Sequence, residues 1–343
     1  MNWREQLSAL VAGYNRLWFY AADPGAVSTL LPVSDEARRQ NKFAGWITEG
    51  WAWESAAVPG AAPAEKISAL PPAHHGDAVM MGQQVDFSRA HRRLHEIAAR
   101  GFDTVFISDH WKDISGIFFT GAGTSLLPTR LLVPDVQART LQMNSLTAAG
   151  FANADIKRSL DIFFHPGVEK GVEMVAAHSA PTLDRLREKY KLNGRTAVMF
   201  LDKVEPEEKS QFGFDWRSSL DLALIYMKET GAVDNLLVKP HPRQNFREVW
   251  EYLEPFRASG HVAPVTERRG GTFIPLCDEV WGMTTILLII AQKAGRPIRA
   301  FMPDRTAEGA AQSNAHIEEF VIKNNTDFSV TYPKNLEKRA GLL

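Results

Sequence analysis

Apolar runs of strand length alternate with helix-patterned segments along most of this chain, and this alternation constrains the fold more than any other feature. Residues 16–22 form an apolar run that breaks at Asp23. Residues 195–202 form another run, and an amphipathic segment follows at 218–231. Because strands that alternate with helices build parallel sheets, the pattern predicts an α/β protein.

The length of the chain favours two domains, because 343 residues exceed the usual size of one hydrophobic core. A polar, charge-rich helical segment at 168–191 suits a connector. We therefore predict two Rossmann-like domains with parallel sheets that face an interdomain cleft, one at 1–187 and one at 188–343. Ligands of such sheets bind outside the carboxyl ends of the strands, so a site is expected there.

Composition and charge exclude several classes of protein. The formal net charge of -1 argues against the basic face that nucleic-acid binding requires. The longest apolar stretch is too short to cross a bilayer and the N-terminus lacks the pattern of a secretory signal, so we expect a cytoplasmic protein without a transmembrane segment. Cys277 is the only cysteine, which excludes an internal disulfide, and we expect it in the core.

One apolar run, Leu236-Leu237-Val238, ends in the sequence Lys-Pro-His-Pro-Arg. Proline fixes φ and donates no hydrogen bond, so the two prolines should end the strand and stiffen the turn. This turn holds three donor side chains, Lys239, His241 and Arg243. A strand end with solvated basic residues would give the same pattern, but three donors around a double proline favour a phosphate-binding turn.

A second element follows about forty residues later. A short strand runs through Gly282 into Thr284 and Thr285, and an apolar helix comes next. Hydroxyls at a helix start can cap it, and the free N–H groups there attract anions. Either threonine could be a plain N-cap. Together with the basic turn, the pair predicts a nucleotide phosphate held from two sides.

The order of a Lys-Pro-His-Pro turn, a Gly-Met-Thr-Thr turn and a closing Gly-Arg-Pro resembles the donor half of bacterial GT-B glycosyltransferases. The motifs are most similar to those of His-Pro-motif sialyltransferases and capsule polysaccharide transferases. This resemblance implies a metal-independent, cofactor-free transferase that uses a CMP- or UDP-linked sugar and a carbohydrate or other hydroxyl acceptor in bacterial surface polysaccharide biosynthesis. It assigns the donor phosphate to Lys239, His241, Arg243, Thr284 and Thr285, with His241 also catalytic.

The chain departs from these sialyltransferases at the general base. Their paired acidic motif ends in glycine, and the nearest match here is Thr48-Glu49-Gly50, with threonine in the position of the base. Glu49, Asp23 and Asp109 are the remaining acids. Asp23 and Asp109 each follow an expected strand, and Glu49 lies among the tryptophans of the segment 42–53. Turn chemistry alone would explain Asp23, and a hydrogen bond at a strand end would explain Asp109.

Four further residues are expected to line the cleft or bind sugar, namely Gly25, His110, His165 and Glu267. His165 could equally be structural. The resemblance places Glu267 where GT-B donor domains hold sugar or ribose, and an ion pair with a neighbouring arginine is the alternative. The segment 42–53 is expected as a strand whose tryptophans form a sugar platform or, as we favour, part of the core.

Other functions fit the same fold. A nucleotide-sugar epimerase or hydrolase would use the same donor site with a different acceptor. A non-catalytic nucleotide-sugar-binding protein is the third hypothesis, because threonine replaces the expected acid. No metal site is predicted, since His74 and His75 lack further ligands at a suitable spacing. A homodimer is the commonest default for oligomers. The polar tail from residue 304 could pack on the first domain, as GT-B tails do.

Overall fold

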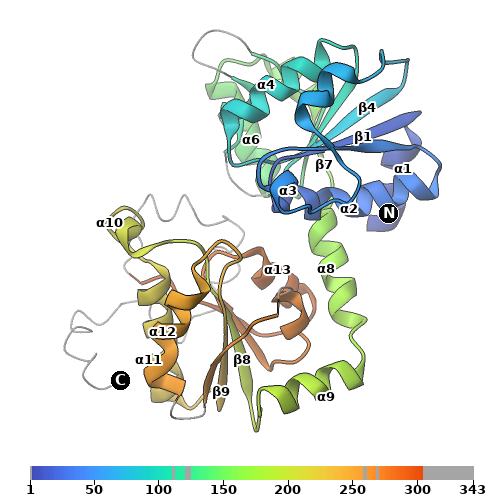
Figure 1. Ribbon diagram of the computed structural model, residues 1–343. Helices are drawn as coiled ribbons and strands as arrows, with labels where there is room; N and C mark the ends of the chain where they lie inside the picture. Colours follow the sequence, from blue (N-terminus) through green and yellow to red (C-terminus); the bar gives the residue numbers. More distant parts are fainter. Residues whose placement is uncertain (1, 110–112, 120–124, 258–260, 268–269, 304–343) are drawn as a thin grey trace. The chain divides into compact units, whose positions relative to one another are not determined.

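The computed structural model describes residues 2–109, 113–119, 125–257, 261–267 and 270–303. It comprises two compact units, Met1–Lys170 and Gly171–Leu343 (Figure 1). Two expectations fall outside the described residues: the position of His110 and the packing of the tail from residue 304. No helix in the described part of the chain is both long enough and apolar enough to cross a membrane.

The first unit is built on a seven-stranded parallel sheet with the strand order β3-β2-β1-β4-β5-β6-β7. The strands are β1 (Arg16–Ala21), β2 (Phe43–Thr48), β3 (Ala62–Pro63), β4 (Asp77–Gly82), β5 (Asp103–Ile107), β6 (Arg130–Val133) and β7 (Leu160–Ile162). The chain moves outward from β1 to β3 and then returns to the other side of β1 with β4. The carboxyl ends of β1 and β4 therefore flank a topological switch point.

Helices cover both faces of this sheet, with α1 and α2 on one face and α4 and α6 on the other (Figure 1). The helices are α1 (Trp3–Ala12), α2 (Pro24–Arg39), α3 (Gly50–Glu54), η1 (Ala64–Ala69), α4 (Phe87–Ala98), α5 (Ser115–Phe118), α6 (Val136–Ala148) and α7 (Asn153–Ser159). Helix α8 (Pro166–Ala176) begins in the first unit and ends in the second. Side chains set several starts: Asp86 caps α4 and Asp135 caps α6 by accepting backbone N–H groups.

The central strands β4 and β5 of the first unit are almost continuously buried, because helices cover both faces of the sheet. Leu17, Phe19 and Ala21 alternate along β1 and pack in the core cluster that also contains Leu30 and Val33 of α2. This continuous burial is typical of parallel sheets.

The sequence predicted one strand over 42–53, and this prediction is wrong. Strand β2 ends at Thr48, and α3 begins at Gly50, which adopts a φ of 51° that favours glycine. Trp46 is buried in the core, whereas Trp51 and Trp53 on α3 are 36% and 46% exposed. The core prediction is therefore confirmed for Trp46 and wrong for the other two tryptophans, because a turn of helix carries them to the surface.

The second unit has a five-stranded parallel sheet with the order β10-β9-β8-β11-β12. The strands are β8 (Thr196–Phe200), β9 (Asn235–Lys239), β10 (Val262–Pro264), β11 (Glu279–Gly282) and β12 (Ile298–Ala300). The helices are α9 (Ala180–Lys189), η2 (Pro206–Glu208), α10 (Lys209–Phe212), α11 (Trp216–Thr230), α12 (Phe246–Arg257), η3 (Gly270–Phe273) and α13 (Ile286–Lys293).

The switch point of the second sheet lies between β8 and β11, by the same reasoning as in the first unit. Both sheets are open, twisted and parallel, so the predicted α/β class with two Rossmann-like units is confirmed. Cys277 is buried as expected, with 1% of its surface exposed, and burial raises the pKa of its thiol well above the usual range.

Close approach of α2 to β4 makes Gly82 sensitive to substitution. A Cβ atom on Gly82 would lie 2.6 Å from the Cβ and 2.8 Å from the Cα of Ala26. The backbone of α2 would have to move, because no flexible side chain can give way. We expect Gly82→Ala to destabilise the first unit by about 2–3 kcal/mol, measured by chemical denaturation.

Gly13→Ala is the matched control in the same unit. Its φ of -69° suits alanine, and the nearest atom to an added Cβ is the carbonyl oxygen of Leu10 at 3.4 Å, an ordinary contact. We expect a change within about 0.5 kcal/mol. Equal losses in the two variants would show that α2 is not packed tightly on β4.

Candidate functional site

The carboxyl edge of the second sheet gathers charged and hydroxyl side chains from four neighbouring strands. Asp202 and Lys203 follow β8, and Lys239 ends β9. Glu267 follows β10, and Thr284 follows β11. Parallel strands present all of these ends at one edge, which is where ligands of doubly wound sheets bind.

The turn after β9 is stiff, as its prolines predict. The backbone N–H of His241 donates to Oε1 of Gln244 at 2.7 Å, and the N–H of Gln244 donates to the carbonyl of His241 at 2.9 Å. Nδ1 of His241 accepts the N–H of Arg243 at 3.2 Å. The neutral imidazole therefore carries its proton on Nε2, which is a hydrogen-bond donor.

His241 is surrounded by positive charge. Burial first, and then the nearby charges of Arg243, Lys203 and Lys239, lower the pKa of His241 to about 4. Burial also lowers the pKa of Lys239, against the opposing influence of Glu267. Three cations thus surround a neutral imidazole, and an anion placed among them would relieve their mutual repulsion.

The two threonines before α13 have different roles in the structure. Thr285 is the N-cap of α13, and its Oγ1 accepts the N–H of Leu287 at 3.4 Å. Thr284 donates both its backbone N–H and its hydroxyl to Oδ2 of Asp202, at 2.5 and 2.6 Å. The start of α13 therefore already holds one carboxylate of the protein. A role of either threonine in phosphate binding stays a prediction.

Glu267 is held by α9 and the residue that follows it. Its carboxylate lies 2.5 Å from Nζ of Lys189 and accepts a short hydrogen bond from the hydroxyl of Tyr190. Burial alone would raise the pKa of Glu267, but the bonds from Lys189 and Tyr190 outweigh it and lower the pKa. An ion pair with Arg268 or Arg269 was the expected alternative, and both arginines lie outside the described residues.

The depressed pKa of His241 predicts a pH-dependent stability. Between pH 6.5 and about 4, the unfolded state binds more protons than the folded state. The contribution of His241 to the free energy of unfolding is therefore fully present above pH 6.5 and is lost as the pH falls toward 4. With a discount of about half for partial exposure of the ring, we expect a loss of about 1 kcal/mol between pH 7.5 and 5.0.

His241→Gln isolates this contribution because glutamine does not titrate. Urea denaturation at both pH values should show the wild type losing about 1 kcal/mol more than the variant. Parallel losses in the two proteins would mean that His241 titrates normally.

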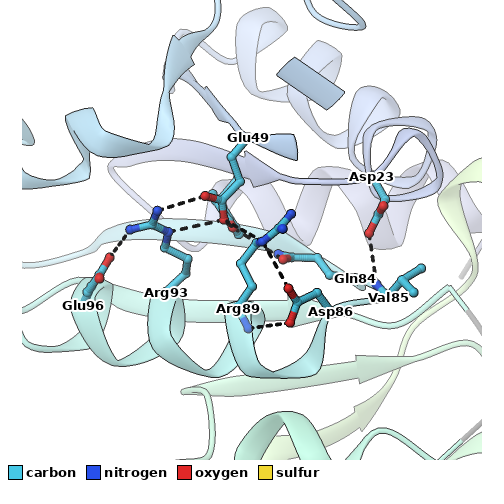
Figure 2. A network of polar contacts seen from close by, with 9 residues as sticks. Asp23, Glu49, Gln84, Val85, Asp86, Arg89, Arg93 and Glu96 are labelled. Atoms are coloured by element: carbon cyan, nitrogen blue, oxygen red, sulfur yellow. Dashed lines mark hydrogen bonds and ion pairs between the residues drawn. The ribbon is translucent and has the colours of Figure 1, made fainter. Parts of the chain in front are cut away.

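The first sheet also collects polar groups at its carboxyl edge. Asp23 follows β1 and stands at the N-cap position of α2. Its Oδ2 accepts the backbone N–H of Val85, after β4, at 3.0 Å (Figure 2). This bond joins the two strands that flank the switch point. Asp23 is partly exposed, and it lies at the position where a ligand of this sheet would bind.

Glu49 lies in a network of ion pairs with helix α4 (Figure 2). Its carboxylate accepts from Arg93 at 2.9 and 3.3 Å, lies 3.9 Å from Arg89, and accepts a short bond from the hydroxyl of Tyr20. Burial would raise the pKa of Glu49, but Arg93 and Tyr20 outweigh it and lower the pKa. The lone pairs of Glu49 are thus largely engaged, which weakens its case as a general base.

Asp109, Gly25 and His165 lie together at the same edge. A Cβ on Gly25 would lie 3.2 Å from Oδ2 of Asp109. Nδ1 of His165 accepts the N–H of Val168 at 3.1 Å, so Nε2 carries the proton and donates to the carbonyl of Asp109 at 3.1 Å. His165 is buried, with 6% exposed, and joins the start of α8 to the end of β5. These bonds support the structural alternative for His165.

Several residues of the two edges were not singled out in the sequence analysis. Tyr20, Arg89 and Arg93 hold Glu49, and Asp202 and Lys203 belong to the second edge. The signal for Asp202 and Lys203 was available, because both follow an apolar run. No local pattern identifies Arg93, which is 44 residues from its partner. No group of three or more potential metal ligands occurs among the residues that the structure describes.

Comparison with known proteins identifies the fold. No family model matches the chain, and no curated protein matches its sequence. Among solved structures, UDP-N-acetylglucosamine 2-epimerase from Rickettsia bellii matches with a TM-score of 0.57 and 13% identity, over 94% of this chain and 93% of that one.

A glycosyltransferase and a wall teichoic acid polymerase show the same likeness. A glycosyltransferase from Rickettsia africae matches with a TM-score of 0.51 and 11% identity, over 96% of this chain and 99% of that one. A variant of the wall teichoic acid polymerase TagF matches with a TM-score of 0.51 and 12% identity, over 96% of this chain and 79% of that one. The chain therefore has the GT-B fold, as the resemblance implied.

Proposed function

We propose that this protein is a GT-B glycosyltransferase that uses a nucleotide-activated sugar. The observation that carries the proposal is the group of three cations, Lys203, Lys239 and Arg243, around the neutral imidazole of His241 at the carboxyl edge of the second sheet. Two prolines and the bonds between His241 and Gln244 hold the backbone of the turn that carries Lys239, His241 and Arg243, so little backbone entropy is lost there on binding. A phosphate is the common anion that matches such a set of donors.

The names of the structural neighbours support the same class of ligand. One acts on a UDP-sugar by its name, and another is named a glycosyltransferase. For this chain we propose a CMP- or UDP-linked donor and a hydroxyl acceptor, without a metal or another cofactor. We place the reaction in the cytoplasm, in the synthesis of a bacterial surface polysaccharide or glycoconjugate.

In the proposed reaction, the acceptor oxygen attacks the anomeric carbon of the donor sugar. The bond from that carbon to the phosphate oxygen breaks, and the nucleotide leaves with the electron pair. Lys239, Arg243 and the Nε2–H of His241 stabilise the developing charge. The acceptor proton passes to a carboxylate of the first unit, which acts as the general base. We favour Asp23 over Glu49, because the carboxylate of Asp23 accepts a backbone N–H, whereas that of Glu49 is bound by Arg93 and Tyr20.

A nucleotide-sugar epimerase is the second candidate. Thr48 stands where the resemblance places the base, and it is buried, with 1% exposed. A reaction without a separate acceptor would not need that base. An epimerase consumes a donor alone, whereas a transferase needs donor and acceptor together, so the two are separated by whether the donor reacts without an acceptor.

A thermal-shift screen against CMP, UDP, GDP, dTDP and their sugars tests the proposal. A ligand at 100 times its dissociation constant stabilises the folded protein by about 2.7 kcal/mol. We expect one nucleotide class to raise the melting temperature, while the matching nucleoside without phosphate does not. No shift with any nucleotide, or an equal shift with the nucleoside, would contradict the phosphate site.

A further inference from the structure

Arg89 of α4 has a guanidinium group that is held only loosely. Its Nε lies 3.4 Å from Oδ2 of Asp86 and 3.9 Å from Oε1 of Glu49, both beyond the usual length of an N–H···O hydrogen bond. In the described part of the chain, Nη1 and Nη2 donate no hydrogen bond. The side chain is 33% exposed. Arg93, one turn further along α4, instead donates to Glu49 at 2.9 Å and to Glu96 at 2.6 Å.

Two links place Arg89 next to Asp23, and the first runs through Gly50. A Cβ atom on Gly50 would lie 2.6 Å from Nη1 of Arg89 and 3.3 Å from the carbonyl oxygen of Ala22. Both atoms are therefore close to the same point, just beyond the end of β1. Asp23 is the next residue of the chain after Ala22.

The second link runs through the segment between β4 and α4. Oδ2 of Asp23 accepts the N–H of Val85 at 3.0 Å. The residue after Val85 is Asp86, which pairs with Arg89. Figure 2 shows these four residues at one edge of the sheet. Oδ1 of Asp23 accepts no hydrogen bond from the residues that the structure describes. N–H donors and a carboxylate oxygen thus lie at the same place.

This combination matches hydroxyl groups. A hydroxyl accepts from an N–H group and donates to a carboxylate at the same time, and the planar fork of a guanidinium group presents two nitrogens to two neighbouring oxygens. An anion fits less well, because carboxylates outnumber guanidinium groups in the network of Figure 2 and would repel it. The carboxylates are those of Asp23, Glu49, Asp86 and Glu96, and the guanidinium groups are those of Arg89 and Arg93.

We propose that Arg89 binds the acceptor and that the acceptor is an uncharged, polyhydroxylated molecule. Nη1 and Nη2 donate to two neighbouring hydroxyls and direct one of them toward Oδ1 of Asp23, which takes its proton in the proposed reaction. This inference rests on the proposed function and assigns an acceptor-binding residue and an acceptor class to it.

Arg89→Lys tests this role, because lysine keeps the positive charge and loses the fork. Saturation-transfer NMR titrations of the full chain use glycerol and the methyl glycosides of glucose, mannose and galactose as probes, with the nucleotide found by the thermal-shift screen at saturation. We expect at least one probe to bind the wild type and to bind the variant about 10- to 30-fold more weakly, because two hydrogen bonds are lost. The affinity for the nucleotide should be unchanged, since that site is in the second unit.

Arg92→Lys is the matched control, because Arg92 is exposed on the same helix. We expect it to bind every probe as the wild type does. If Arg89→Lys does not fold, the wild type gives a second test by reaction with phenylglyoxal, mapped by mass spectrometry. The bound probe should slow the modification of Arg89 and leave that of Arg92 unchanged. Equal rates at Arg89 with and without the probe would overturn the inference.

Glucose 6-phosphate tests the charge of the acceptor. With the nucleotide site saturated, we expect it to bind more weakly than methyl glucoside. Tighter binding of the phosphate would overturn the uncharged class.

The outcomes separate this inference from the proposed function. Equal binding of the probes to the wild type and Arg89→Lys, or no binding of any probe to the wild type, overturns the role of Arg89 and leaves a nucleotide site in place. Absence of nucleotide binding overturns the proposed function, whatever the sugars do.

Discussion

Replacement of His241 by asparagine should weaken nucleotide binding by about 10- to 100-fold and leave the fold intact. The Oδ1 atom of asparagine can take the place of Nδ1 and keep the bond from the N–H of Arg243, which is 3.2 Å long in the wild type. The variant loses only the Nε2–H donor. A hydrogen bond to a charged phosphate contributes about 1.5–3 kcal/mol, which sets the expected range.

Calorimetry with the nucleotide found by the thermal-shift screen measures this effect. His241→Gln is the conservative variant, because its amide nitrogen reaches the place of Nε2, and it should recover about tenfold of the loss. His261→Asn is the surface control in the same unit, since Nδ1 of His261 contacts the carbonyl of Asp234 at the amino edge of the sheet. A folded His241→Asn with wild-type affinity would remove the phosphate role of this histidine.

Asp23→Asn should lower turnover by about a thousandfold and change nucleotide affinity by less than threefold. The amide keeps an oxygen acceptor for the N–H of Val85, which is 3.0 Å from the aspartate. Only the capacity to take a proton is lost, and general-base catalysis contributes about 10²–10⁴ in rate. The nucleotide is expected to bind in the second unit, so its affinity should be little affected.

Release of nucleotide from the donor, with the acceptor present, measures the turnover of this variant. Glu49→Gln is the informative comparison. It removes the charge that Arg93 and Tyr20 hold, so it should cost about 3 kcal/mol of stability and reduce turnover less than Asp23→Asn does. If Glu49→Gln is the slower enzyme at equal nucleotide affinity, the base is Glu49, and the engaged carboxylate must open during the reaction.

The sequence predicted the parts of this protein that depend on short-range physics. The apolar run before Lys239 ends where the prolines remove donors, and the structure ends β9 at that residue. Thr285 was one of two expected caps, and it caps α13. The alternation of strands and helices gave the two parallel sheets. Local chain geometry is enough for each of these predictions.

The strand expected at 42–53 shows where local patterns stop being sufficient. The aromatic run favours a strand by composition, yet the chain leaves the sheet after Thr48 and turns into a helix. Trp46 and Trp53 then have opposite environments, with 3% and 46% of their surfaces exposed. Hydrophobicity is the same for both residues, and the position relative to the sheet edge decides which one is buried.

By itself, the sequence determined that strand ends would present Asp23, Lys239 and His241, because turn and proline chemistry act over a few residues. Only the tertiary structure decided the partners. Glu49 meets Arg93 across 44 residues, and Asp202 meets Thr284 across 82. Strand order sets these meetings, and strand order follows from the packing of the whole sheet. The interaction between two charges is largely screened beyond about 10 Å in salt solution. Which acid is bound by a cation therefore depends on neighbours in three dimensions, which no local sequence pattern encodes.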